Sequence, residues 1–199
     1  MTIAYRLGSG LYLNITNACA CNCIFCIRNN VNGVGDAKSL WLETEPSISE
    51  ITEAIDSYYP FSGINEIVFC GFGEPLERAD VVIAVSQHIK KIKPALPVRL
   101  NTNGLVFLMH PGFDISQLAI IDTMSISLNA DDAVEYTRIS RPRYGEKAFD
   151  AMLDFARKAS KICTVVLSVL DGTLSPERVN NCQRIATEMG ASFKIRPME

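Results

Sequence analysis

Residues 11–28 read LYLNITNACACNCIFCIR, and in this stretch a strand-like pattern runs directly into a loop rich in cysteine. Apolar and polar side chains alternate over residues 11–17, which predicts a β-strand with one buried face. Cys19, Cys23 and Cys26 follow at C-x3-C-x2-C spacing. Three thiolates this close together can bind one face of a metal cluster, but they cannot occupy all four iron positions of a [4Fe–4S] cluster.

The number and distribution of the cysteines limit what the loop can be. The chain has seven cysteines, an odd number, and four of them lie in this one loop. Such a distribution does not look like a disulfide framework, and it favours metal binding or redox chemistry in a reducing compartment. Structural zinc is the alternative that the loop alone leaves open. Cys21 breaks the three-cysteine spacing, so we expect it to be an unliganded residue of the loop.

Length and composition are those of an ordinary globular domain. The chain has 199 residues, 48% hydrophobic and 21% charged, and its net charge of −3 gives no general field for a polyanion. We expect a single domain over residues 1–199, without an auxiliary cluster domain, because there is no second cysteine cluster. The first ten residues do not resemble a signal peptide, and no apolar stretch reaches the ~18 residues of a membrane span. We therefore expect a cytoplasmic protein without a membrane partner.

Strand-like and helical patterns alternate along the chain, which predicts an α/β fold with a parallel sheet. Ser47 and Glu50 form a capping-box pattern before a helix that ends at Pro60, and Ser175 is the expected N-cap of the last helix. The connection after the third strand has only a short helical candidate, at 116–119. The expected strands are 11–17, 66–71, 98–104, 123–129, 162–169 and 192–197, and other helices are expected at 80–93, 131–140 and 146–160.

Most of these strands carry one polar face. In the third strand, Val98 and Leu100 oppose Arg99, Asn101 and Asn103. Strands of a flat sheet with helices on both faces would read as nearly continuous apolar runs. A curved sheet with helices outside and a polar ligand inside explains the alternation better. Six β/α units are too few for a closed eight-fold barrel, so we expect an incomplete (β/α)6 barrel whose open side could admit a large or macromolecular substrate.

These features resemble the radical S-adenosylmethionine (radical SAM) superfamily over almost the whole chain. The hallmark of that family, three cysteines after the first strand with an aromatic residue before the last, is met by Cys19, Cys23, Phe25 and Cys26. The resemblance implies that the three thiolates hold a [4Fe–4S] cluster and that its fourth iron binds S-adenosylmethionine (SAM). It further implies reductive cleavage of SAM to a 5′-deoxyadenosyl radical, which abstracts hydrogen from a substrate that the sequence does not identify.

The resemblance also implies contacts to SAM at the carboxyl ends of the strands, where β/α barrels carry their chemistry. Residues 70–75, CGFGEP, resemble the GGEP motif that receives the amino group of SAM, with Phe72 in place of the usual first glycine. Residues 127–129, SLN, resemble a motif that contacts its ribose or carboxylate. For Asn103 an Asn-Gly turn is an equal alternative, and for Arg196 a solvated rim position. The expected cofactor contacts are Phe25, Gly73, Glu74, Pro75, Asn101, Asn103, Ser127, Asn129, Ser168 and Arg196.

Within the superfamily, the chain resembles the small radical SAM proteins linked to TatD-type nucleases. The residues that carry this resemblance are the cysteine loop, 40–47, 127–130 and 141–145. It implies a functional link to such a nuclease, and the family implies an electron donor of the flavodoxin or ferredoxin type. Activating enzymes for glycyl-radical proteins, which act on a protein partner, are an alternative, as is a non-catalytic zinc or iron–sulfur module. The long loop 28–45 is expected to carry function, with Trp41 over the adenine, over the open side or anchoring the loop.

Overall fold

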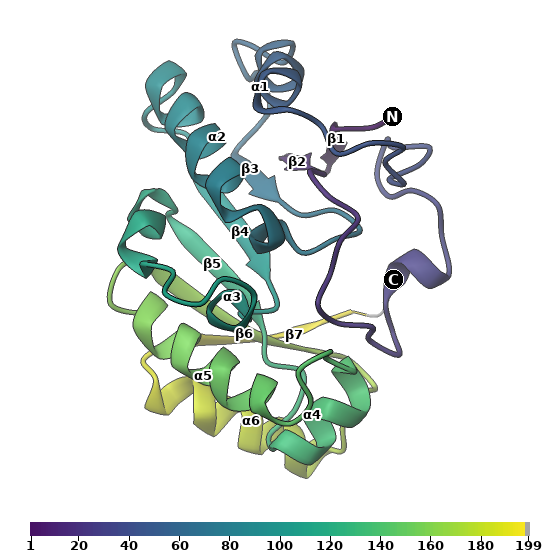
Figure 1. The fold of residues 1–199 in the computed structure, drawn as a ribbon, viewed down its shortest axis with the longest axis vertical. Helices are drawn as coiled ribbons and strands as arrows, with labels where there is room; N and C mark the ends of the chain where they lie inside the picture. Colours follow the sequence, from purple (N-terminus) through teal and green to yellow (C-terminus); the bar gives the residue numbers. More distant parts are fainter. Residues whose placement is uncertain (198–199) are drawn as a thin grey trace.

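The protein, described here over residues 1–197 by a computed structural model, is built on one curved sheet of seven strands in the order β1 to β7 (Figure 1). β1 pairs with β2 in antiparallel fashion, and all later neighbours are parallel. The strands are β1 (Ala4–Leu7), β2 (Gly10–Leu13), β3 (Glu66–Phe69), β4 (Val98–Thr102), β5 (Thr123–Ser127), β6 (Thr164–Leu170) and β7 (Ser192–Arg196).

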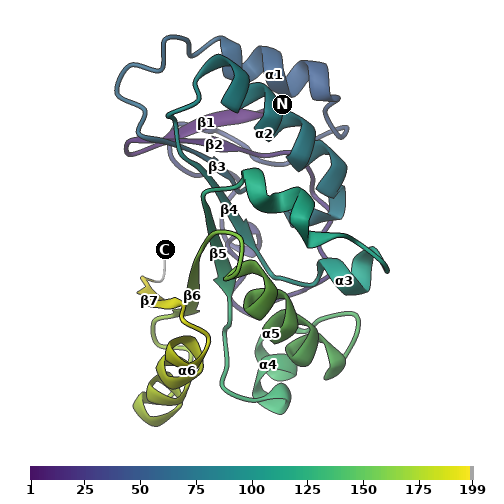
Figure 2. The same ribbon diagram turned by 90° about the vertical axis from the view of Figure 1, so that its left-hand side faces the viewer.

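Helices connect the parallel strands and cover one face of the sheet (Figure 2). The predicted capping box is confirmed, because Ser47 Oγ accepts from Glu50 N at 3.3 Å and Glu50 Oε2 accepts from Ser47 N at 2.8 Å. The helices are α1 (Ile48–Asp56), α2 (Ala79–Ile92), α3 (Val106–Met109), α4 (Ala133–Ser140), α5 (Lys147–Ala159) and α6 (Pro176–Glu188), with short 3₁₀ helices η1 (Ile27–Asn29), η2 (Pro75–Arg78) and η3 (Ile115–Ile120). Among residues 1–197 no helix is long and apolar enough to cross a bilayer.

The two faces of the sheet differ as the alternation in the sequence predicts. Leu100 and Ile126 face the helices and are fully buried, whereas Arg99, Asn101 and Ser125 face the opposite, concave side and are partly exposed. Because the strand order runs from β1 to β7 without closure, the sheet is an open barrel rather than a closed one. The expected incomplete barrel is confirmed.

β1 was not expected from the sequence. It forms a hairpin with β2 across Gly8 and Ser9, in which Tyr5 pairs with Tyr12. Two short runs separated by Gly-Ser are a recognisable hairpin signal, but each run has only four residues, and the signal is correspondingly weak. The hairpin covers the outer edge of β2, so that the first parallel strand does not present a free edge.

The strand predicted at residues 11–17 corresponds to β2. It ends earlier than predicted, at Leu13, because the polar residues after it bind loop 28–45. Asn14 Nδ2 donates to Leu40 O at 2.8 Å. Asn17 makes a two-way bond with Leu42, from its Nδ2 to Leu42 O at 2.7 Å and from Leu42 N to its Oδ1 at 3.2 Å. We expected the polar face of this strand to line the barrel interior. Beyond Leu13 it instead fixes the long loop.

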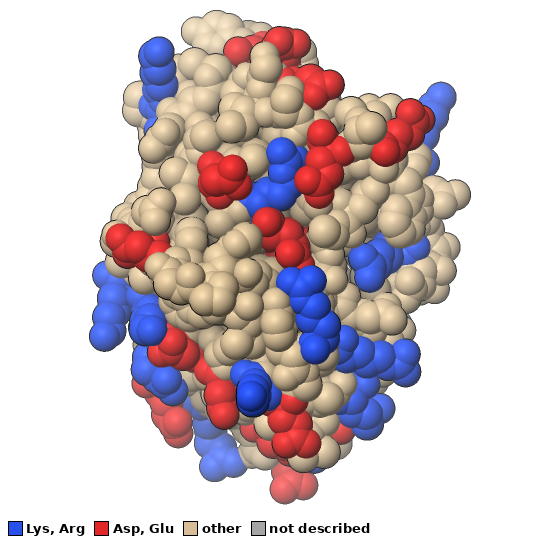
Figure 3. Space-filling model, viewed as in Figure 1, with Lys and Arg blue, Asp and Glu red and all other residues tan. Residues whose placement is uncertain are grey.

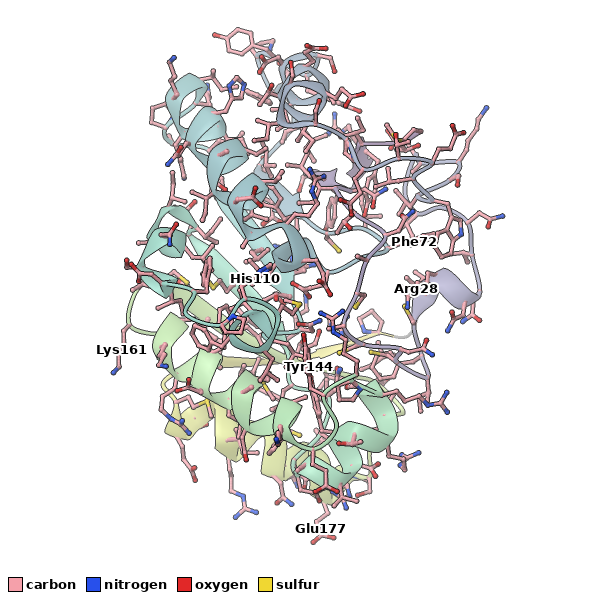
Figure 4. All side chains as sticks on the ribbon, viewed as in Figure 1. Arg28, Phe72, His110, Tyr144, Lys161 and Glu177 are labelled. Carbon is pink, nitrogen blue, oxygen red and sulfur yellow. The ribbon has the colours of Figure 1, made fainter. Side chains whose placement is uncertain are left out.

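A small second core supports the same loop. Leu40 and Ala37 pack with Tyr5 and Phe72. Trp41 lies edge-on against Phe72 with 5.1 Å between ring centroids, and it remains 43% exposed. Phe72, the residue that departs from the family motif, is thus a contact of the loop. Figure 4 shows it on the side of the molecule that loop 28–45 occupies.

Candidate cluster and cofactor site

The cysteine loop connects β2 to η1 and is held along its length by the end of α4 and the residues that follow it. Backbone bonds run from Asn22 N to Ser140 O at 3.1 Å, from Ile24 N to Ile139 O at 2.9 Å and from Arg143 N to Ala20 O at 2.9 Å. An isolated antiparallel bridge pairs Cys21 with Pro142. The loop therefore rests on residues 139–143, which we call the support segment.

The thiols of the loop divide into two kinds. Cys19, Cys23 and Cys26 are partly exposed, whereas Cys21 is only 5% exposed. A hydrogen bond from the Cys21 thiol is the main cause that lowers the pKa of Cys19 to about 6, and the same kind of bond lowers the pKa of Cys23. The pKa of Cys21 is raised for the corresponding reason, and that of Cys26 is raised by burial. The pKa shifts therefore favour the protonated form of Cys21 beside the thiolate forms of Cys19 and Cys23.

This donor set fits an iron–sulfur cluster. All seven cysteines are free, and three partly exposed thiols project from one loop. Among residues 1–197, no three His, Cys, Asp or Glu side chains converge closely enough to hold one metal ion. A structural zinc ion needs four ligands around one point, whereas the thiolates of a [4Fe–4S] cluster bind separate irons, and three of them leave one iron open. Three partly exposed thiols in one loop match the second number of ligands.

The loop after β3 packs directly on the cysteine loop. A Cβ atom at Gly73 would lie 2.3 Å from Thr16 O and 2.6 Å from Ala18 O, so only glycine fits there. Glu74 N donates to Ala18 O at 2.8 Å. Gly73 was expected as a contact of the cofactor. In the structure, the atoms that approach it are the backbone oxygens of Thr16 and Ala18.

Glu74 is a buried brace between two strands. Its carboxylate is 4% exposed and accepts from Thr102 Oγ1 at 2.7 Å, Asn103 N at 2.7 Å and Leu76 N at 3.0 Å. Burial, followed by the nearby Cys19 thiolate, raises its pKa to about 8. Pro75, also buried, begins η2 directly after it. The carboxylate therefore fixes the turn to the end of β4.

Asn101, on β4, and Asn103, just after it, have different surroundings. Asn101 faces the concave side, where its Oδ1 accepts from Arg99 Nη1 at 3.1 Å. Asn103 Oδ1 accepts from Leu105 N at 2.9 Å, while its Nδ2 lies 3.9 Å from Cys19 Sγ. The turn expected as one alternative for Asn103 is present, with Gly104 at a φ of +74°. The same side chain also reaches a sulfur of the cysteine loop.

Of the polar residues expected on β5 and β6, one faces solvent and two are buried. Ser127 is partly exposed at the end of β5. Asn129 is 3% exposed, has a φ of +59° and donates from Nδ2 to Ser140 Oγ at 3.0 Å. Ser168 is also buried, and its Oγ donates to Ile126 O at 3.5 Å. Of the three, only Ser127 is partly exposed.

The concave side carries two arginines, of which Arg196 was expected as a cofactor contact and Arg99 was placed only on the polar face of its strand. Arg99 makes a two-pronged pair with Glu66, at 2.9 and 2.7 Å, and reaches Tyr12 Oη at 3.2 Å. Arg196 of β7 is close enough to act electrostatically on Cys70, whose pKa is raised first of all by burial. The alternation of β4 could have pointed to Arg99. No comparable signal marked Ser140, since it lies on a helix.

Phe25, between the second and third cysteines of the motif, is partly exposed. Arg28 of η1 donates to Cys21 O at 3.4 Å and lies at the outer side of the loop (Figure 4). A surface hollow of about 310 Å³ lies elsewhere, between α6 and β7, and is lined by Leu174, Val179 and Ile195 among others. It contains none of the expected site residues.

Comparison with known proteins gives one family. A family model described as the Radical SAM superfamily matches residues 13–181, which include the cysteine loop, the turn after β3 and all strands from β3 to β6. No curated protein matches the chain.

Solved structures share the fold at low sequence identity. *Streptococcus suis* SuiB bound to S-adenosylmethionine superposes with a TM-score of 0.73 at 14% identity, covering 97% of this chain and 41% of SuiB. SuiB bound to its precursor peptide SuiA gives 0.72 at 15% identity, covering 97% and 40%. TYW1 with a lysine-pyruvate adduct gives 0.62 at 16% identity, covering 96% and 65%. This chain thus spans about two fifths of SuiB and less than two thirds of TYW1.

Proposed function

The chain belongs to the radical SAM superfamily, and on that premise we propose that it is an enzyme in which Cys19, Cys23 and Cys26 hold a [4Fe–4S] cluster that binds SAM. When bound, these groups supply one-electron chemistry, in which the sulfonium is cleaved reductively and a hydrogen atom is taken from the substrate. The observation that carries the proposal is the division of the loop into three partly exposed thiols and one buried thiol.

The chain's own groups prepare the place for SAM in two ways. Glu74 brings the turn after β3 against the end of β4, so that the backbone of residues 71–73 lines the rim beside the cysteine loop. Asn101 and Ser127 present partly exposed polar side chains on the same concave side. We therefore assign contacts with SAM to the backbone of this turn and to Asn101, Ser127 and Arg196. Glu74, Asn129 and Ser168 act behind them, because their side chains are buried and bonded within the protein.

The substrate enters, in this proposal, through the open side of the barrel. The sheet does not close between β1 and β7, and the concave side between them carries Arg99, Ser125 and Arg196. A macromolecular substrate would be accommodated there, as would the loop of a protein partner in an activating enzyme. The resemblance to the TatD-linked proteins supports a place beside a nuclease. Its residues 141–145 overlap the support segment at 141–143, where Arg143 N and Arg141 O bond to the backbone of the cysteine loop.

A protein that donates single electrons must approach the cysteine loop, and the surface there is basic. Residues 1–35 contain no acidic side chain. Arg28 lies on the loop itself, and Arg141 and Arg143 are exposed on the support segment. Figure 3 shows blue side chains gathered on the lower right of the molecule, below the more acidic upper part. This charge supports an acidic carrier of the flavodoxin or ferredoxin type, since complementary charge speeds encounter.

The test is anaerobic reconstitution with iron and sulfide, followed by reduction in the presence of SAM. We expect about four irons per chain and release of 5′-deoxyadenosine, as one-electron cluster chemistry requires. The matched variants are Cys23→Ala, which should lose the cluster, and Cys182→Ala, a buried cysteine on α6, which should keep it. A chain that binds zinc alone and leaves SAM intact would support a non-catalytic module instead.

A further inference from the structure

The sulfur of Cys19 receives two N–H groups from the chain. Cys21 N donates to it at 3.4 Å, and Asn103 Nδ2 at 3.9 Å. The first is a backbone group of the loop itself. The second is a side chain from the end of β4, so a different part of the fold reaches the thiolate. Hydrogen bonds to cluster sulfurs are one of the means by which a protein sets the reduction potential of the cluster.

The amide of Asn103 cannot easily turn away from Cys19. Its Oδ1 accepts from Leu105 N at 2.9 Å, which leaves the Nδ2 end to face the sulfur. Its backbone N donates to Glu74 Oε2 at 2.7 Å, and Glu74 is held in turn by Thr102. With the side chain almost fully buried, these bonds aim the donor at one place.

We propose that Asn103 raises the reduction potential of the bound cluster by donating a hydrogen bond to the Cys19 thiolate. This rests on the proposed function, because it requires a cluster on the three cysteines. The reason for the direction is electrostatic. The electron added on reduction increases the negative charge on the sulfurs, and N–H and O–H donors stabilise that charge more than they stabilise the oxidised state.

The experiment is a redox titration of the reconstituted protein without SAM, followed by electron paramagnetic resonance of the reduced cluster. In Asn103→Ser, the shorter side chain can still accept from Leu105 N but cannot reach Cys19. We expect its midpoint to fall, with about tenfold less reduced cluster at a fixed potential, or 59 mV for one electron. The matched control is Asn65→Ser, the same change at an exposed position before β3.

Iron content and circular dichroism show whether each variant is folded and loaded. The proposal is overturned if the midpoint of loaded Asn103→Ser equals that of wild type or moves no more than that of Asn65→Ser. It is equally overturned if Asn103→Ser loses affinity for SAM at an unchanged midpoint, because Asn103 would then be a SAM contact. Failure of the wild-type chain to form a cluster would instead refute the proposed function.

Discussion

Cys21 is two residues away from both Cys19 and Cys23 in the sequence, but its surroundings differ from theirs. Cys21 is buried against Pro142, while Cys19 and Cys23 are partly exposed. We expect Cys21→Ala to bind the same amount of iron as wild type, because its thiol is not needed as a ligand. Cys19→Ala should bind little. Iron analysis after anaerobic reconstitution, with the absorbance of the cluster, measures both. Loss of iron in the Cys21 variant would make Cys21 a ligand.

Glu74 gives a second prediction for a single residue. In Glu74→Ala, the donors Thr102 Oγ1, Asn103 N and Leu76 N lose the acceptor that they share. A buried donor left without a partner costs about 1–3 kcal/mol. We expect a loss of at least that size in the free energy of unfolding of the protein without cluster, measured by urea titration. Glu43→Ala, at an exposed position, is the matched control and should be neutral. An equal stability of the two variants would show that Glu74 is not a brace.

For single residues, the sequence indicated which residues belong to the candidate site, but not which other residues they contact. The three cysteines and the turn after β3 could be found because each forms a short motif of residues that are close together in the sequence. That Asn129 bonds Ser140, or that Asn103 faces Cys19, could not be read from it, since these contacts join separate β/α units and depend on the path of each loop. Phe72 is similar. Its departure from the motif was visible, but its packing against Trp41 was not.

Among the elements, loop 28–45 is the one whose order depends most on a few side chains. Asn17 bonds Leu42 in both directions and is the central clamp. We expect Asn17→Ala to increase hydrogen exchange of the Leu42 amide and its neighbours by up to about tenfold, since each lost bond contributes roughly 1 kcal/mol. Asn30→Ala, an exposed change in the same loop, should leave exchange at wild-type rates. Equal exchange in both variants would mean that the apolar contacts of the loop suffice.

The start of α4 is tied to α6 by charge. Asp132 caps α4 by accepting from Glu135 N at 2.8 Å and pairs with Arg178 at 2.8 Å, and Asp131 also bonds Arg178. The bond from Glu135 N, and then the one from Arg178, hold the pKa of Asp132 below its usual range. Stabilisation by this carboxylate is therefore present above its unfolded pKa of ~3.9 and is lost as the pH falls through the lower folded value.

Asp132→Asn keeps a good capping residue but removes the charge. We expect a loss of less than about 1 kcal/mol at pH 7, because the pair is half exposed. The gap between variant and wild type should stay constant above about pH 5 and shrink below about pH 4. Unfolding curves in urea across this range measure it, with Asp154→Asn, which breaks an exposed pair within α5, as control. A gap independent of pH would exclude the charge as its origin.

The order of the elements was predictable from the sequence, because turn residues and apolar periodicity mark each β/α unit. The residues at which the helices and strands begin and end were harder to predict. The first strand stops at Leu13 since Asn14 and Asn17 bind a loop instead of a neighbouring strand. The β1 hairpin escaped prediction because each of its strands is only four residues long.

For the molecule as a whole, the basic surface around the cysteine loop predicts the response to an electron carrier. Arg141→Glu should slow reduction of the cluster by a flavodoxin hydroquinone by about three- to tenfold at low salt, because opposite charges speed encounter. The difference should vanish near 1 M salt, where screening acts within ~3 Å. Stopped-flow absorbance of the cluster measures these rates. Arg157→Glu on the exposed side of α5 is the control. Equal slowing by both variants would place the encounter elsewhere.

The support segment under the cysteine loop has a consequence for the order of biosynthesis. Ribosomes make the cysteines early, while residues 139–143 that bond to Ala20, Asn22 and Ile24 emerge only after five strands and the helices between them. Until then the cysteine loop lacks the backbone bonds that hold it along its length. Iron is therefore expected to be inserted late, into an almost finished barrel, and a nascent chain stalled before residue 139 should be unable to retain it.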